Sequence, residues 1–320
     1  MSTEYNIQQV QASIEAARNE IAKVLVGQTE MVHLLFTALL AEGHVLIEGV
    51  PGVAKTLAAK LVAQTMQVPF SRIQFTPDLM PSDILGTSVF NPKTTDFQFK
   101  KGPIFSNLVL IDEINRSPAK TQAALFEVME EKQVTNDGTS MPMNAPFMVL
   151  ATQNPIEQEG TYRLPEAQLD RFLFKIEVGY PNLEEEVKIL EHTHQGLTAH
   201  FSKEVAPVFS ATDIVGFQAL VSKVYIEPHV LQFIANLIQQ TRNHKFLYLG
   251  ASPRASVAIL KAAKASAAIA GRDFVTPDDV IRVAHPVLCH RLMLTPEKEM
   301  EGVTIADVIQ NIIQKIEVPR

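Results

Sequence analysis

The chain has 320 residues, of which 46% are hydrophobic and 20% are charged, a balance typical of globular proteins with about two domains. This composition excludes a disordered chain and a small disulfide-stapled one. The 28 basic and 35 acidic residues give a net charge of −7, and no basic run is present that would follow a nucleic-acid backbone. Nucleic acid is therefore not an expected partner.

The amino-terminal residues and the single cysteine indicate the compartment. Residues 1–5 lack the basic and then apolar pattern of a signal peptide, and Cys289 has no second cysteine with which to form an intramolecular disulfide. The longest apolar runs, 45–47 and 108–111, are far shorter than the roughly 18 residues that cross a bilayer. We therefore expect a cytoplasmic protein without a membrane span.

Apolar periodicity predicts two helices at the start of the chain. Residues 7–24 repeat apolar side chains every three or four positions, and a second helix over 30–42 ends at Gly43. From there to about residue 180, short apolar runs alternate with longer connections, which predicts a parallel α/β sheet. The five expected strands are 45–47, 73–75, 108–111, 147–151 and 172–178.

Helical patterns replace the strand-like runs after residue 181. The first 180 residues contain 14 basic and 20 acidic residues, and the remainder contains 14 and 15, so neither part is basic. We predict an α/β core with an amino-terminal helix over 1–180 and an all-helical domain over 181–320. The expected helices of the second domain are 183–193, 211–222, 227–243, 253–270, 277–290 and 304–316.

A loop between the first strand and a helix over 57–65 nearly fits the phosphate-binding pattern G-x-x-x-x-G-K-[ST]. Backbone N–H groups at the helix start would surround a phosphate, Lys55 would reach the β- and γ-phosphates, and the Thr56 hydroxyl would ligate Mg²⁺. Ala54 replaces the second glycine, which costs little in right-handed helical backbone but interferes at positive φ. An ordinary strand-to-helix turn is the alternative for this loop alone. The expected binding residues are Gly49, Pro51, Gly52, Val53, Ala54, Lys55, Thr56 and Leu57.

Two carboxylates end the expected strand over 108–111. Because ligands of open parallel sheets bind at the carboxyl ends of the strands, Asp112 is expected beside the phosphate loop. Asp112 would hold Mg²⁺, and Glu113 would polarise the attacking water. A solvated acidic strand end is the alternative.

Three further residues are candidates for the same chemistry. Asn154, after the strand over 147–151, could align that water, although Asn-Pro also forms ordinary turns. Arg171 begins the fifth strand, away from its own phosphate loop, so its target would be the γ-phosphate on a neighbouring subunit, unless it forms a surface pair with Asp170. Arg254 follows Pro253 at a helix start and could touch nucleotide, unless it is merely solvated.

Histidines and the cysteine in the second domain do not predict a metal site. His192 and His194 form one pair, and His285, Cys289 and His290 form another group. Neither group offers four ligands at zinc spacing, so we expect these residues to be structural.

The ordered set of motifs resembles the MoxR group of AAA+ ATPases over about residues 7–295. This resemblance implies a P-loop NTPase (AAA+) core with a carboxy-terminal helical lid, ATP and Mg²⁺ between the two domains, and a ring, typically a homo-hexamer, with nucleotide between subunits. It assigns Asn154 as sensor 1, Arg171 as the arginine finger and Arg254 as sensor 2. Alanine before the lysine is usual in the family, whereas Arg163 stands where a proline is expected. The segments that carry the resemblance are 26–28, 49–56, 72–84, 112–116, 151–155, 159–172 and 252–255.

The resemblance also implies a biological role. Members act as ATP-hydrolysing, chaperone-like remodellers of protein clients in maturation, activation or cofactor insertion, often with partners that carry a von Willebrand factor A domain. Insertions over 87–102 and 133–139 would contact clients, the second as a hairpin with a turn at Asp137-Gly138. At this second insertion only Lys132 is basic and the turn carries Asp137, which disfavours a DNA-dependent motor. A nucleotide-sensing scaffold with little turnover is the other alternative.

Overall fold

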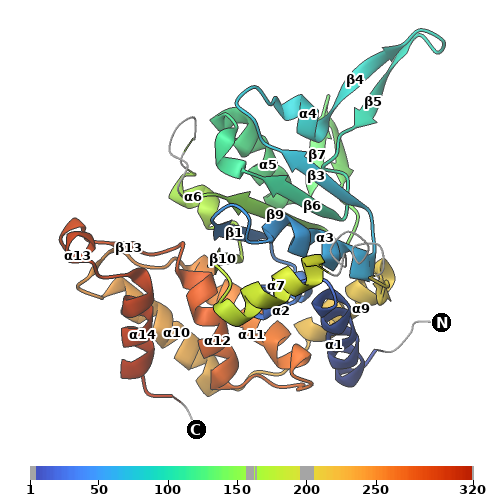
Figure 1. The fold of residues 1–320 in the computed structure, drawn as a ribbon. Coiled ribbons are helices and arrows are strands. Elements are labelled where there is room, and N and C mark those ends of the chain that lie inside the picture. Colours follow the sequence, from blue (N-terminus) through green and yellow to red (C-terminus); the bar gives the residue numbers. More distant parts are fainter. Residues whose placement is uncertain (1–4, 156–161, 163, 195–204, 319–320) are drawn as a thin grey trace.

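The computed structural model describes residues 5–155, 162, 164–194 and 205–318 (Figure 1). Arg163 and the segment Glu159-Gly160-Thr161, both used in the sequence comparison with the family, lie outside the described residues.

A five-stranded parallel sheet forms the centre of the molecule (Figure 1). Its spatial order is β10-β1-β9-β6-β3, so the chain leaves β1 for the far edge, returns strand by strand, and passes β1 to place β10 on its other side. All carboxyl ends therefore meet at one edge, as a parallel α/β sheet requires. The strands are β1 (Val45–Gly49), β3 (Phe70–Gln74), β6 (Leu108–Asp112), β9 (Met148–Gln153) and β10 (Phe174–Val178).

Alternate residues of the central strands enter two different cores. Leu108 and Leu110 face the core formed with the amino-terminal helices and the carboxy-terminal helices, whereas Val109 and Ile111 face the core beneath α5 (Ala119–Glu131). Since both faces are covered, the central strands are continuously apolar rather than alternating. The other elements of this region are α1 (Ile7–Ala22), α2 (Thr29–Leu40), α3 (Lys55–Thr65), α4 (Pro81–Leu85), a 3₁₀ turn (Ile114–Arg116) and α6 (Glu166–Leu169).

The fifth strand begins later than the sequence pattern predicts. Phe172 and Leu173 are buried, but the Phe172 carbonyl accepts hydrogen bonds from His290 and Arg291 instead of pairing in the sheet. β10 therefore starts at Phe174. The apolar run over 172–178 therefore marks buried residues, but only Phe174–Val178 pair in the sheet.

Two hairpins project from the core on the side away from the carboxy-terminal helices (Figure 1). One joins β4 (Gly86–Asn91) to β5 (Asp96–Lys101), and the other joins β7 (Gln133–Asn136) to β8 (Thr139–Pro142). Asp137 and Gly138 both have positive φ, which confirms the predicted hairpin turn. Ser88 Oγ donates to Asp137 Oδ2 at 2.9 Å, so the hairpins contact each other.

The carboxy-terminal region is mainly helical, as predicted, and its described residues also include short strands that the sequence pattern does not indicate. A short antiparallel pair joins β12 (Leu247–Leu249) to β13 (Met293–Leu294), and β11 (Phe209–Ser210) pairs with β2 (Met66–Gln67) of the core. These strands are too short to give an alternating sequence signal. The described helices are α7 (Leu183–His194), α9 (Ala211–Ser222), α10 (Pro228–Arg242), α11 (Pro253–Ile269), α12 (Pro277–Leu288), α13 (Pro296–Met300) and α14 (Ile305–Lys315).

Among the described residues, no helix combines the length and the apolar character that a bilayer span requires.

Candidate functional site

The phosphate-loop candidate connects β1 to α3 at the carboxyl edge of the sheet. Ala54 precedes α3 with φ 60° and ψ 22°, the left-handed conformation in which a Cβ is strained, and no side chain caps the helix there. With no side chain capping the start of α3, the N–H groups of this helix start favour an anion. A Cβ on Gly49 would meet the Val178 carbonyl at 2.6 Å, so close approach of β10 requires glycine.

Lys55 and Thr56 form the first turn of α3. The Lys55 ammonium donates to the Gly49 carbonyl, within the loop, and to the Gln153 carbonyl at 3.2 Å, at the end of β9. Thr56 Oγ1 donates to Asp112 Oδ1 at 3.2 Å. The loop, β6 and β9 therefore converge on one point.

Asp112 is buried at the tip of β6 and its carboxylate is fully hydrogen-bonded. Thr152 Oγ1 donates to Oδ1 at 3.1 Å, in addition to Thr56, and Arg72 Nε lies 2.6 Å from Oδ2. These donors satisfy the oxygens of a buried carboxylate. Sequence reasoning missed Arg72 and Thr152, although Arg72 belongs to a segment that carries the family resemblance.

Glu113 follows with φ 58°, a left-handed backbone that turns its side chain out of the strand direction. Gln74 Nε2 donates to Glu113 Oε2 at 2.9 Å, and Arg116 Nε lies 3.0 Å from the same oxygen. Gln74 was also missed as a site residue: it lies in the segment 72–84 that carries the family resemblance, but its contact with Glu113 depends on the pairing of β3 with β6.

A cavity of about 390 Å³ brings together most of the predicted site residues. Asn154, buried after β9, lines it beside the two carboxylates. Gly49 and Val53 of the phosphate loop do not line it, and neither do Arg171 and Arg254. The lining residues are Pro51, Gly52, Ala54, Lys55, Thr56, Leu57, Arg72, Gln74, Asp112, Glu113, Thr152, Gln153 and Asn154.

Arg171 and Arg254 meet instead at Glu130, near the end of α5. Arg171 Nη2 lies 2.9 Å from Glu130 Oε2, and Arg254 Nη2 lies 2.8 Å from Glu130 Oε1. Arg171 also donates to the Phe126 carbonyl. The two arginines come from different domains of the predicted division, and they share one carboxylate outside the phosphate cavity of their own chain.

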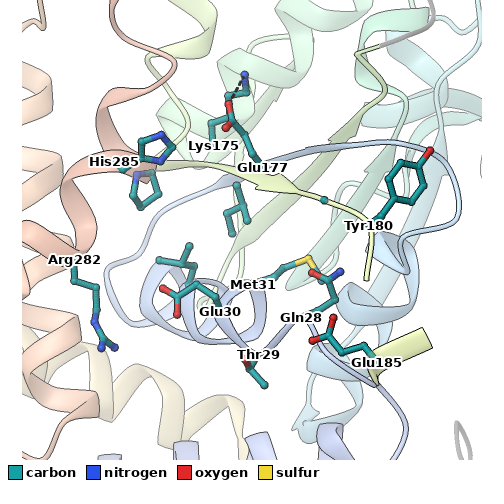
Figure 2. Close-up of a pocket in the computed structure, with 14 residues that line it drawn as sticks. Gln28, Thr29, Glu30, Met31, Lys175, Glu177, Tyr180, Glu185, Arg282 and His285 are labelled. Carbon is teal, nitrogen blue, oxygen red and sulfur yellow. Dashed lines mark ion pairs between the residues drawn. The ribbon is translucent and has the colours of Figure 1, made fainter. Parts of the chain in front are cut away.

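A second cavity, of about 580 Å³, lies along β10, the edge strand beside β1 (Figure 2). Figure 2 shows Gln28 and Glu30 from the start of α2 on one side, Arg282 and His285 from α12 at one end, and Tyr180 at the other. Because Val178 pairs with Gly49, Tyr180 lies on the side where the phosphate loop begins.

Lys175 is the basic side chain of β10 in this cavity. It lies 2.8 Å from Glu48 and 3.4 Å from Glu177. Burial lowers the pKa of Lys175, but the hydrogen bond to Glu48 and the two carboxylate charges outweigh that effect, so its pKa is raised. This ammonium therefore stays charged and paired.

Two of the residues set aside as metal ligands, Cys289 and His290, contact the backbone of the core. Cys289 Sγ lies 3.6 Å from the Lys175 carbonyl, and His290 Nε2 lies 3.1 Å from the Phe172 carbonyl. Burial raises the pKa of the Cys289 thiol to about 12, so it is inert as a nucleophile at neutral pH. Within the described part of the chain, no group of three or more His, Cys, Asp or Glu residues is placed to hold a metal ion.

Comparison with family models finds two matches. The ATPase family associated with various cellular activities (AAA) matches residues 44–174, from the start of β1 to the start of β10. The AAA lid domain matches residues 239–312, within the carboxy-terminal helices.

Individual proteins match over nearly the whole chain. The uncharacterized protein YeaC of Bacillus subtilis is 46% identical, over 95% of this chain and 94% of its own. Chaperone MoxR1 of Mycobacterium tuberculosis is 43% identical, over 96% of this chain and 83% of its own. The crystal structure of a presumed ATPase from Cytophaga hutchinsonii superposes with a TM-score of 0.90 at 41% identity, over 98% of this chain and 97% of that one.

Proposed function

Because the chain belongs to the MoxR group of AAA+ ATPases, we propose that it binds ATP with Mg²⁺, hydrolyses it at subunit interfaces of a ring, and uses the energy to remodel protein clients. The observation that carries this proposal is the single cavity shared by Lys55, Thr56, Asp112, Glu113 and Asn154. These side chains supply phosphate binding, metal ligation and water activation at one edge of the sheet.

The phosphate loop and its neighbours fit a nucleotide with Mg²⁺. The N–H groups at the start of α3 would bind the phosphates, and the Lys55 ammonium would exchange the carbonyls of Gly49 and Gln153 for phosphate oxygens. Thr56 Oγ1 and Asp112 Oδ1, 3.2 Å apart, offer the oxygen ligands that Mg²⁺ prefers. Bound Mg²⁺ neutralises charge on the transferred phosphoryl group.

Water activation falls to Glu113, with Asn154 aligning the water. Glu113 must first leave the hydrogen bond with Gln74, since a carboxylate so engaged has less capacity to accept a proton. This contact also favours the second candidate function, a nucleotide sensor with slow turnover until a partner or client frees Glu113.

The base of the nucleotide is proposed to lie in the cavity along β10, at the end near Tyr180 (Figure 2). Its volume, about 580 Å³, is within the range of cofactor sites. The Tyr180 ring is 76% exposed and offers a face on which a base could stack.

The catalytic arginines are proposed to act on a neighbouring subunit. Arg171 and Arg254 do not line the phosphate cavity of their own chain, but they lie together at Glu130. In a ring, a neighbour's γ-phosphate would replace the Glu130 carboxylate as their anionic partner. One interface would then contain the phosphate loop of one subunit and two arginines of the next.

Protein clients are favoured over DNA by the charges of the β7–β8 hairpin. Lys132, the basic residue at the β7–β8 hairpin, lies 2.8 Å from Glu42, so its charge is already paired. The relative named Chaperone MoxR1 supports a protein client. The resemblance adds von Willebrand factor A domain proteins as candidate partners.

Steady-state hydrolysis and nucleotide binding test the proposal together. Lys55→Ala should abolish ATP binding, whereas Arg171→Ala should keep ATP binding and lose turnover by about 10³-fold. Specific activity should rise with protein concentration, because the site needs a neighbour. Lys60→Ala, an exposed lysine on the same helix, is the matched control and should change neither. A wild-type rate in both Lys55→Ala and Arg171→Ala would refute the proposal.

A further inference from the structure

The finger residue Arg171 lies in a short turn between α6 and β10 whose backbone is held from the carboxy-terminal domain. Arg291, which follows α12, lies 2.6 Å from Asp170 Oδ1 through its Nε and donates to the Asp170 carbonyl at 3.1 Å. It also donates to the Phe172 carbonyl at 2.6 Å and the Leu173 carbonyl at 3.2 Å. One guanidinium thus bonds residues on both sides of Arg171.

Arg291 makes this contact as a buried side chain. Its side chain is only 4% exposed, and its remaining bond within its own domain goes to the Val287 carbonyl. A planar guanidinium with five donors can hold several carbonyls in one arrangement, which an ammonium cannot. The finger turn would lose several acceptor contacts at once if Arg291 were replaced.

A second element of the same domain reaches the turn. Ser252 Oγ, just before α11, donates to Asp170 Oδ2 at 3.2 Å, and Arg254 shares Glu130 with Arg171. Asp170 is therefore bound from both α11 and α12. Any rotation of these helices relative to the sheet must displace the finger turn as well.

The contact between domains here combines apolar packing with polar bonds. Phe172 and Leu173 are buried, but a cavity of about 200 Å³ lies beside them, and its lining includes Asp170, Ser252 and Arg291. Because side chains do not fill this space, the polar bonds add to what packing provides. The hydrogen bonds of Arg291 link the turn that carries Arg171 to the carboxy-terminal domain.

We propose that Arg291 is a positioning residue: it couples the carboxy-terminal domain of one subunit to the finger Arg171 and thereby to the catalytic site of the neighbouring subunit. This inference rests on the proposed function, specifically on Arg171 acting across an interface. Through this coupling, the carboxy-terminal domain of one subunit would affect ATP hydrolysis in the neighbouring subunit.

Mixed rings test the proposal in the full-length protein. Arg291→Gln should lower kcat by at least about 10-fold while its ATP affinity stays within about twofold, because its own phosphate cavity is intact. Mixed one to one with Glu113→Gln subunits, whose fingers are intact, Arg291→Gln should regain activity above both parents. Arg171→Ala mixed with Glu113→Gln is the reference for a lost finger.

Arg272→Gln is the matched control. Arg272 makes a bidentate pair with Asp279 inside the same domain, at 2.7 Å to each oxygen, without contacting the finger turn. Its loss should reduce the melting temperature without lowering kcat. If Arg291→Gln does not fold, Arg291→Lys and Asp170→Asn keep most of the site and should show the same defect and the same rescue, to a smaller extent.

The outcomes separate this inference from the proposed function. Rescue of Arg171→Ala without rescue of the Arg291 variants, or an unchanged kcat in those variants, overturns the positioning role alone. Absence of rescue for Arg171→Ala shows that the finger does not act on a neighbour, and both proposals then fail together.

Discussion

Ala54 shows how one residue can carry strain at a binding loop. Its φ of 60° suits glycine, yet the chain places a Cβ there. The sequence left two backbone conformations open for this position, and the structure has the strained one. Sequence patterns cannot resolve such a choice, because φ is set by the loop's closure against β10 and α3.

Substitution of Ala54 tests the strain. Ala54→Gly should raise the free energy of unfolding by up to about 1 kcal/mol, since relief of about 1–2 kcal/mol is partly offset by the greater entropy of the unfolded chain. Ala58→Gly, in the right-handed interior of α3, is the control and should lower it by about 0.5–1 kcal/mol or more. Urea denaturation measures both. Destabilisation by both substitutions would argue against a left-handed Ala54.

The buried side chain of His44 makes the free energy of unfolding depend on pH. Its Nε2 lies 3.0 Å from the Met129 carbonyl and its Nδ1 accepts from the Val149 N–H at 3.0 Å, an arrangement that requires the neutral ring. Burial lowers the pKa of His44 to about 4, and burial likewise depresses the pKa of His290. Protons therefore bind the unfolded chain first as the pH falls.

The free energy of unfolding should consequently be constant, as far as these histidines contribute, above pH 6.5 and fall between pH 6.5 and 4. His44 contributes at most about 1.4 kcal/mol per pH unit over that interval. His44→Gln should be less stable at neutral pH but have a shallower slope. Denaturation at a series of pH values measures this, and an unchanged slope in His44→Gln would count against a neutral buried His44.

Some residues at the candidate site could be predicted from the sequence, and others could not. Lys55, Thr56, Asp112 and Glu113 follow from local motifs, because each motif combines a strand end with its functional residue. Gln74 and the carboxylate that holds both arginines, Glu130, gain meaning only when distant segments meet.

Among the elements, the β4–β5 hairpin exposes aromatic side chains where the core exposes few. Phe90 and Phe97 pair across the strands with ring centroids 5.4 Å apart, and they are 47% and 67% exposed. An exposed aromatic pair on a projecting hairpin suits contact with apolar segments of an unfolded client.

If this hairpin contacts clients, its aromatic residues should be needed for client-stimulated ATP hydrolysis but not for basal hydrolysis. The double substitution Phe90→Ser with Phe97→Ser should leave basal ATP hydrolysis unchanged and reduce its stimulation by casein, an unfolded probe, several-fold. Tyr248→Ser removes an aromatic of similar exposure, 77%, from β12 and should leave stimulation intact. Equal stimulation in the hairpin variant and wild type would exclude this hairpin as the contact.

Apolar periodicity predicted most helices, but it did not predict whether the apolar face of each helix is buried. Residues 183–193 repeat apolar side chains as an amphipathic helix does, and α7 forms there, yet Leu183 and Leu190 are 80% and 65% exposed. The moment of a helix indicates that one face prefers burial; it does not identify the partner surface.

At the scale of the molecule, the parallel sheet with its helical domain was predictable, whereas the relation between the two was not. The parallel sheet follows from buried apolar runs that alternate with longer connections, whereas the strand order β10-β1-β9-β6-β3 comes from the structure. The docking of α11 and α12 on the finger turn depends on Arg291, Ser252 and Asp170, three polar residues without a common motif. The expectation that nucleotide lies between the domains stays a prediction: the described lid residues do not line the phosphate cavity, but Arg282 and His285 of α12 line the cavity proposed for the base.

ATP hydrolysis with Glu113 activating the water is tested most directly by comparing kcat and ATP affinity between wild type and Glu113→Gln. We predict that Glu113→Gln loses at least about 100-fold in kcat, the usual contribution of a general base, while ATP affinity changes little. A Glu113→Gln variant that hydrolyses ATP at the wild-type rate would contradict it.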